Sequence, residues 1–180
     1  MKRLFLISLC AFLSISVHAQ HIYSSKSATI SFFASTPAED VEATSTKASS
    51  VIDTKTRNLI FKVSNTTFQF PKKLMQEHFN ENYMESDKYP ASTFKGKIRD
   101  DIDLAKDGTY QVMVDGSLDI HGVSKNYQTK TTLVVSKGTI TAKTAFKVKV
   151  EDHQIKIPTL VFAKIAQIVD VQISAVYQPK

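Results

Sequence analysis

Cysteine, tryptophan and glycine are scarce in this chain. Its 180 residues include one cysteine, Cys10, no tryptophan and five glycines. A lone cysteine forms no internal disulfide, and Cys10 lies in an N-terminal leader, described below, so the remaining chain has no thiolate chemistry. No glycine-rich loop is available to hold a phosphate group, and the hydrolase patterns Gly-x-Ser-x-Gly and His-Glu-x-x-His do not occur.

The histidines and acidic residues form no recognisable catalytic or metal-binding set. Outside the leader four histidines remain, none three or four residues from another: His21, His78, His121 and His153. Asp100, Asp101 and Asp103 cluster, but the other oxygen ligands of a calcium site are not evident, so we interpret them as a solvated loop. An enzyme acting on a lipid would need a polar pair such as His78 with Asp87. We predict no catalytic residues, no metal and no cofactor.

The first nineteen residues have the pattern of a secretory signal peptide. Lys2 and Arg3 precede an apolar run over residues 4–17, and Ala19 ends a segment with small residues where a signal peptidase cleaves. We therefore predict cleavage before Gln20, a single domain over 20–180, and a periplasmic or secreted location. No later stretch is apolar and long enough for a transmembrane helix.

The net charge is mildly positive. The chain carries 23 − 17 = +6, and loss of Lys2 and Arg3 leaves 21 − 17 = +4. The lysines are scattered along alternating segments and are not interleaved with aromatic residues, which argues against nucleic-acid binding. Such an excess is compatible with transient contact with a membrane surface or with a phosphorylated ligand.

Most of the chain alternates between apolar and polar residues, as strands with one buried face do. The clearest stretch has six residues in one phase: Tyr110, Val112, Val114, Gly116, Leu118 and Ile120. Similar stretches occupy 21–35, 40–48, 58–70, 92–98, 127–135, 140–150 and 169–177. Asp107-Gly108 is a hairpin-turn signal. The pattern predicts an all-β fold of about eight strands in an antiparallel meander that closes into a barrel.

Residues 71–83 interrupt this pattern and predict one short helix. Pro71 suits the first turn of a helix, because its missing N–H would have no partner there. Five residues then fall on one helical face: Leu74, Met75, His78, Phe79 and Tyr83. Tyr89-Pro90 favours extended chain beyond the helix. One helix in an all-β chain is most simply a lid over one end of the barrel.

Small residues recur on the inward face of the predicted strands: Ala43, Gly96, Gly116, Ala142, Thr144 and Ala175. An eight-stranded barrel is just wide enough to be filled by its own side chains or to hold one slender ligand. The small residues either leave a cavity or accommodate bends and facing aromatic rings. Both interpretations stay open at this point.

Two stretches together carry a family resemblance. HFNENYMESDKYPASTFKGKI, residues 78–98, and DGSLDIHGVSKNYQTKTTL, residues 115–133, resemble the YceI-like family of small secreted or periplasmic proteins, and IPTLVFAKIAQIVDVQISAVY near the C-terminus also fits. Asp119 and Ser124 stand where threonine is frequent in the family. The resemblance implies an extended, lipocalin-like antiparallel barrel with a helix at one end, whose interior binds polyisoprenoid chains such as quinone tails.

We therefore predict eleven residues around a lipid pocket, chosen from the alternation more than from the family motifs. Eight are inward positions on strands: Phe94, Ile98, Val112, Val114, Leu118, Leu133, Phe146 and Ile173. Three close the mouth: Leu74, Met75 and Phe79.

Two hypotheses follow. In the first, the protein is a non-catalytic carrier for an isoprenoid lipid, either a quinone or a prenyl phosphate. A prenyl phosphate would require a basic rim, for which the candidates are Arg57, Lys62, Lys95, Lys97 and Arg99. In the second, the barrel is filled and serves as a protein-interaction or stress-related structural module. The sequence predicts no oligomeric state.

Overall fold

The structure, a computed structural model, describes residues 21–35, 39–156 and 167–180. The predicted leader over 1–19 lies outside these residues, so its cleavage stays a prediction.

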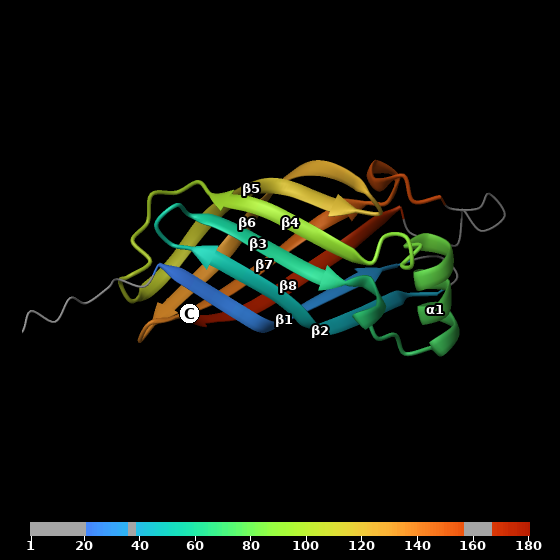
Figure 1. Ribbon diagram of the computed structural model, residues 1–180. Coiled ribbons are helices and arrows are strands. Elements are labelled where there is room, and N and C mark those ends of the chain that lie inside the picture. The colour runs from blue at the N-terminus through green and yellow to red at the C-terminus, as the bar shows by residue number, and fades with distance from the viewer. Residues whose placement is uncertain (1–20, 36–38, 157–166) are drawn as a thin grey trace, which may run out of the picture.

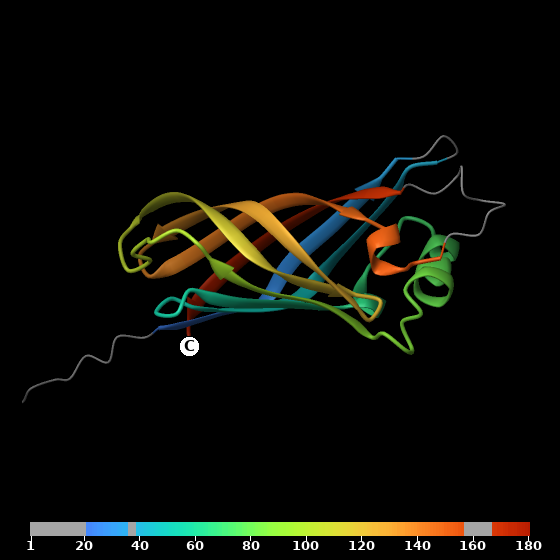
Figure 2. The same cartoon turned by 90° about the horizontal axis from the view of Figure 1, so that it is seen from above.

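Eight antiparallel strands form one closed barrel (Figures 1 and 2). They are β1 (Ile22–Ala34), β2 (Val41–Asp53), β3 (Asn58–Ser64), β4 (Ala91–Ile98), β5 (Gly108–Ile120), β6 (Val123–Ser136), β7 (Thr139–Lys149) and β8 (Ile168–Pro179). Each strand pairs with the next, and β8 pairs with β1 to close the ladder. This confirms the predicted all-β, eight-stranded antiparallel barrel.

The predicted helix lies across one end of the barrel (Figure 1). It consists of α1 (Lys73–His78) and a π-helical turn, η2 (Phe79–Tyr83). The helix begins two residues later than Pro71, because Gln69 bridges to Thr44 of β2 and keeps the preceding chain extended. Among the described residues, no helix has the length and apolar character needed to cross a membrane.

Two hairpins use the tight turns that the strand twist favours. His121-Gly122 joins β5 to β6 with φ values of 54° and 73°, and Lys137-Gly138 joins β6 to β7 with 49° and 73°. Positive φ at both central residues is the hairpin geometry in which glycine is preferred. The turn predicted at Asp107-Gly108 is wrong, because β4 and β5 are joined by a longer loop over 99–107.

The loop over 99–107 closes the barrel end opposite α1. Leu104 is 4 % exposed and packs into the main core cluster. The Asp107 carboxylate accepts a hydrogen bond from the Lys137 backbone N–H at 3.0 Å, which ties the loop to the β6–β7 turn. The Asp100 carboxylate accepts one from the Met113 N–H at 2.6 Å. Asp100 and Asp107 therefore fasten the loop.

Gly96 and Gly116 face each other across β4 and β5, where the Phe94 ring lies against them. A Cβ atom added at Gly116 would lie 2.5 Å from the Lys95 carbonyl oxygen, 2.5 Å from Cζ of Phe94 and 2.6 Å from Cα of Gly96. Neither glycine lines the cavity described below. These glycines therefore accommodate an aromatic ring, which was one of the two interpretations of the small inward residues.

We expect Gly116→Ala to destabilise the barrel by about 1–3 kcal/mol, because the new methyl group meets backbone atoms that cannot turn aside. Denaturant unfolding measures this change. Gly108→Ala is the matched control, since its added Cβ would meet only the tip of the Tyr110 ring at 3.3 Å. Equal stability of Gly116→Ala and wild type would contradict the close packing at this glycine pair.

Candidate functional site: an apolar cavity inside the barrel

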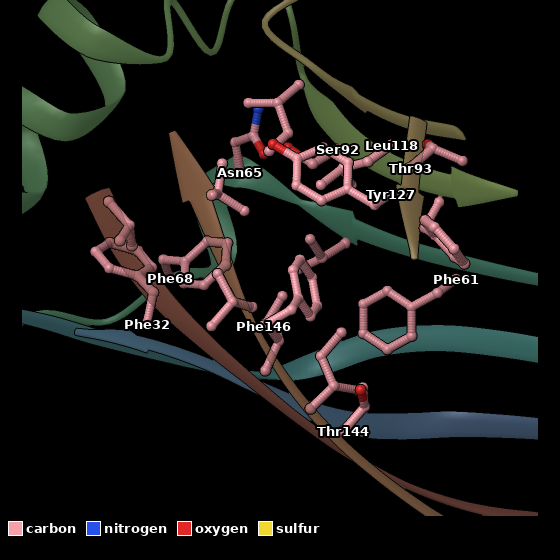
Figure 3. A pocket seen from close by; sticks show the side chains of 18 of the residues that line it. Phe32, Phe61, Asn65, Phe68, Ser92, Thr93, Leu118, Tyr127, Thr144 and Phe146 are labelled. Carbon is pink, nitrogen blue, oxygen red and sulfur yellow. The ribbon is translucent and has the colours of Figure 1, made fainter. Parts of the chain in front are cut away.

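The barrel encloses a cavity of ≈ 660 Å³ that opens toward α1 and receives side chains from all eight strands. Figure 3 shows part of its lining. The walls are mainly aliphatic and aromatic, with Phe61, Phe146 and Leu118 among them. The volume lies within the usual range of small-molecule sites. The second hypothesis requires a filled interior, and the structure does not have one.

Ten of the eleven predicted pocket residues line this cavity: Phe94, Ile98, Val114, Leu118, Leu133, Phe146, Ile173, Leu74, Met75 and Phe79. Val112 does not line the cavity, so this part of the prediction is wrong. It is 2 % exposed and belongs to the packed cluster that includes Leu104, Val135 and Ile140. Val112 points inward as predicted, but it lies toward the end that the 99–107 loop fills. That these residues bind a ligand stays a prediction.

Four phenylalanine rings hold the helix at the mouth. Phe79 of η2 stacks on Phe32 of β1 with ring centroids 5.6 Å apart, and it also lies 5.6 Å from Phe68 and 5.1 Å from Phe70. All four rings line the cavity. Neither α1 nor η2 has a fully buried residue, and Leu74 of α1 is 60 % exposed although it lines the mouth. The helix therefore rests on the barrel through η2 and the preceding segment.

Among the described residues, the charged side chains that line the cavity lie at its mouth. Lys72, which precedes α1, forms an ion pair with Glu39, and both residues line the cavity entrance. His78 also lines the cavity, whereas Asp87 is exposed and does not. The pair that an enzymatic hypothesis would require is therefore not assembled. No cluster of three or more possible metal ligands occurs in residues 21–35, 39–156 and 167–180.

The polar groups deeper in the cavity are mostly engaged with one another. The hydroxyls of Thr129 and Thr144 are hydrogen-bonded to each other, and Thr144 Oγ1 also donates to the Lys130 carbonyl oxygen at 2.9 Å. Every fully buried side-chain nitrogen and oxygen among the described residues has a hydrogen-bond partner. Thr129 and Thr144 therefore offer an occupant little free hydrogen-bonding capacity.

A tyrosine–histidine pair lies near the mouth. His153 is fully buried, and its Nδ1 lies 2.9 Å from the Val123 carbonyl oxygen, so Nδ1 carries the proton. Nε2 is then an acceptor for the Tyr127 hydroxyl, 3.2 Å away, and the two rings are stacked. Burial, with a smaller contribution from Asp152, raises the pKa of Tyr127. Tyr127 therefore lines the cavity as a neutral, fixed ring.

Asn65 fastens the β3 end of the mouth to the start of β4. Its side chain is fully buried at the cavity edge, where Nδ2 donates to the Tyr89 carbonyl oxygen at 2.7 Å and Oδ1 accepts from Ser92 Oγ at 2.9 Å. Figure 3 shows Asn65 and Ser92 together beside Tyr127. The alternating stretch predicted over 58–70 is a strand only as far as Ser64, and residues 65–67 form a 3₁₀ turn.

The five residues suggested as a basic rim for a prenyl phosphate do not form one. None of Arg57, Lys62, Lys95, Lys97 and Arg99 lines the cavity. Arg57 lies at the end opposite α1, where it pairs with Asp101 at 2.9 Å, and Arg99 pairs with Asp115 at 3.0 Å. The three lysines point outward from β3 and β4.

Comparison with known proteins identifies the family of the chain. The family model for the YceI-like domain matches residues 14–177. The chain belongs to the YceI-like family. Among curated protein sequences, the comparison found no significant match.

Solved structures share this YceI-like fold. A polyisoprenoid-binding domain from Saccharophagus degradans, implicated in plant cell wall breakdown, matches with a TM-score of 0.75 and 17 % identity over 90 % of this chain and 100 % of that one. Burkholderia cenocepacia BcnA matches with a TM-score of 0.69 and 16 % identity over 83 % and 95 %. The Campylobacter jejuni YceI protein matches with a TM-score of 0.55 and 17 % identity over 98 % and 97 %.

At the inner end of the cavity, Tyr177 takes part in a buried chain of hydrogen bonds that generates a pH prediction. Its hydroxyl donates to Ser50 Oγ at 2.8 Å, and Ser50 Oγ donates to the Ile60 carbonyl oxygen at 2.7 Å. Burial raises the pKa of Tyr177 above its ordinary value of 10.0, and the hydrogen bond with Ser50 opposes this only in part.

We expect Tyr177 to stabilise the fold by about 1 kcal/mol relative to Tyr177→Phe below pH 10. Above pH 10 the unfolded tyrosine loses its proton while the folded one keeps it, so this stabilisation should decrease as the pH rises further. Denaturant unfolding of both proteins across this range measures the difference. A difference that stays constant or grows would show that the hydroxyl is not held neutral by burial.

Proposed function

We propose that the protein binds an elongated apolar lipid in the barrel interior and acts as a non-catalytic carrier or sequestering protein. The observation that carries the proposal is the open cavity, whose walls are mainly apolar and whose charged lining residues, in the part of the chain that the structure describes, lie at the mouth. Membership of the YceI-like family supports it, as does the similarity to a domain described as polyisoprenoid-binding.

The affinity in this proposal comes from burial of the chain. Each buried CH₂ group contributes about 0.8 kcal/mol. Several isoprene units therefore outweigh the cost of immobilising the ligand, without a specific polar contact. A polyisoprenoid suits the site because its branched methyl groups can pack against rings such as Phe61 and Phe146.

A neutral headgroup fits the mouth better than a phosphate does. Lys72 is the cavity-lining lysine of the described residues, and Glu39 already neutralises it. A quinone needs no cation, whereas a prenyl phosphate would have to compete with Glu39 for Lys72. Within the isoprenoid class we therefore favour a quinone over a prenyl phosphate.

In this mechanism the lipid partitions between membrane and barrel. The helix and its flanking loops move, the apolar tail enters past the Phe79 cluster, and the headgroup stays at the wet rim. No bond is made or broken, and no cofactor is needed. With the leader predicted over 1–19, the site of this exchange would be the periplasm or the outside of the cell.

We expect Ala142→Phe to reduce lipid binding by about tenfold or more, because the added ring displaces at least two buried methylene groups. Ala142 lines the cavity, whereas Ala145 on the same strand is exposed, so Ala145→Phe makes the same change outside the barrel. The measurement is mass spectrometry of lipid extracted from protein purified without detergent, together with uptake of a quinone.

Wild type and Ala145→Phe should carry and take up comparable amounts of lipid. The proposal fails if wild-type protein contains no lipid and takes up no quinone, or if both phenylalanine variants bind as wild type does.

We also expect Phe79→Ala to speed the release of a bound quinone to acceptor vesicles by about fivefold or more, because the variant loses ring contacts worth at least about 1 kcal/mol beyond their buried area. Leu74→Ala is the control, since Leu74 lies at the mouth but is largely exposed. Stopped-flow transfer measures the two rates. If Phe79→Ala and Leu74→Ala released at the same rate, the ring cluster would not be the gate.

A further inference from the structure

The outer surface of β1–β4 carries five exposed lysines and is almost free of acidic residues. The lysines are Lys26 on β1, Lys47 on β2, Lys62 on β3, and Lys95 and Lys97 on β4. β1, β3 and β4 contain no aspartate or glutamate, and β2 has them only at its two ends. We call this surface the lysine face.

Two exposed aliphatic side chains lie among these lysines. Val51 of β2 is directly opposite Ile60 of β3, and Ile60 is directly opposite Lys95 of β4. Val51 is 39 % exposed and Ile60 is 49 % exposed. Lys62 and Lys97 are the outward residues two positions from Ile60 and Lys95 on the same strands. Figure 1 shows β2, β3 and β4 side by side on the near face of the barrel.

Little of the charge on the lysine face is compensated within the protein, although Lys97 lies directly opposite Asp115 of β5, whose carboxylate pairs with Arg99. None of the five lysines forms an ion pair with another described residue. Near the mouth, by contrast, Lys72 pairs with Glu39 and Lys73 lies 3.6 Å from Glu77. The helix end is therefore locally neutralised, and the uncompensated positive charge is on the side of the barrel.

We propose that the lysine face docks the protein on an anionic lipid bilayer, with the five lysines at the headgroup phosphates and Val51 and Ile60 at the headgroup boundary. A plane of phosphates attracts nearby lysines, and each one contributes separately. Exposed aliphatic side chains add binding to a lipid surface. A single-stranded nucleic acid would instead stack its bases on several aromatic rings, whereas among the described residues of β1–β4 the exposed aromatic ring is Phe33 alone.

Docking in this way places the side of the barrel on the bilayer. β3 leads through the turn at 65–67 into α1, so the cavity mouth lies at the edge of the docking face. The contact requires only the outer surface, and it is therefore independent of what the cavity binds.

Vesicle sedimentation tests the proposal with the complete mature protein. Wild type should sediment with phosphatidylcholine vesicles that contain phosphatidylglycerol, should be released by added salt, and should not sediment with phosphatidylcholine alone. Lys62→Gln/Lys95→Gln should weaken the binding by about fivefold for each lysine removed. Ile60→Ser should weaken it further while leaving the salt dependence unchanged.

Lys130→Gln/Lys143→Gln is the matched control. It removes the same charge from exposed positions on β6 and β7, and Figure 2 shows β3 and β7 on opposite sides of the barrel. The control should lose less than twofold in binding. Quinone uptake from detergent solution should be the same for both double variants, which separates this proposal from that of the cavity ligand.

Three results would overturn the proposal. If wild type does not bind anionic vesicles, the lysine face is not a docking surface. Equal losses in the two double variants would mean that only the net charge matters. Binding to soluble poly-glutamate with the same lysine dependence, in the absence of vesicle binding, would identify an acidic polymer as the partner instead of a membrane.

Discussion

Closure of the strand ladder is the constraint on which the rest of the structure depends. Once β8 pairs with β1, no strand edge is left unpaired and one face of every strand points into a shared interior. What fills that interior is then decided by the size of the inward side chains. Here they leave a cavity of ≈ 660 Å³.

The two ends of the barrel are built differently. At the end opposite α1, Leu104 of the long loop packs with Val112, Val135 and Ile140, and the Tyr177–Ser50 hydrogen bond lies in the buried interior. At the other end the closure is a short helix with no buried residue, held mainly by the rings that surround Phe79. An end held by few contacts opens at lower cost than a packed core does. The asymmetry gives an apolar occupant one way in.

The fold was largely predictable from the sequence, because strands with one buried face repeat every two residues. The alternation from Tyr110 to Ile120 identified β5 and its inward face, and the helix stood out where that period was lost. The connection after β4 was not predictable in this way. Asp107-Gly108 has the composition of a tight turn, but Asp107 is used to bind the Lys137 N–H and the loop that precedes it extends to residue 99.

The sequence predicted which strand residues face the interior, but not how far along the barrel the cavity extends. Alternation showed that Val112 and Val114 point inward, yet it could not show that a loop fills the barrel at the level of Val112 and stops short of Val114. Nor could it show that Gly96 and Gly116 hold the Phe94 ring, because that contact depends on the register of two strands. The contact of Tyr127 with His153 joins residues 26 apart in sequence, with no local signal for it.

An experimental electron-density map of the protein purified without detergent would test the central claim most directly. The account predicts continuous, elongated density between Phe61 and Phe146, with one end at the mouth beside Phe79. A barrel whose side chains meet across the middle, or an interior occupied only by ordered water, would contradict it.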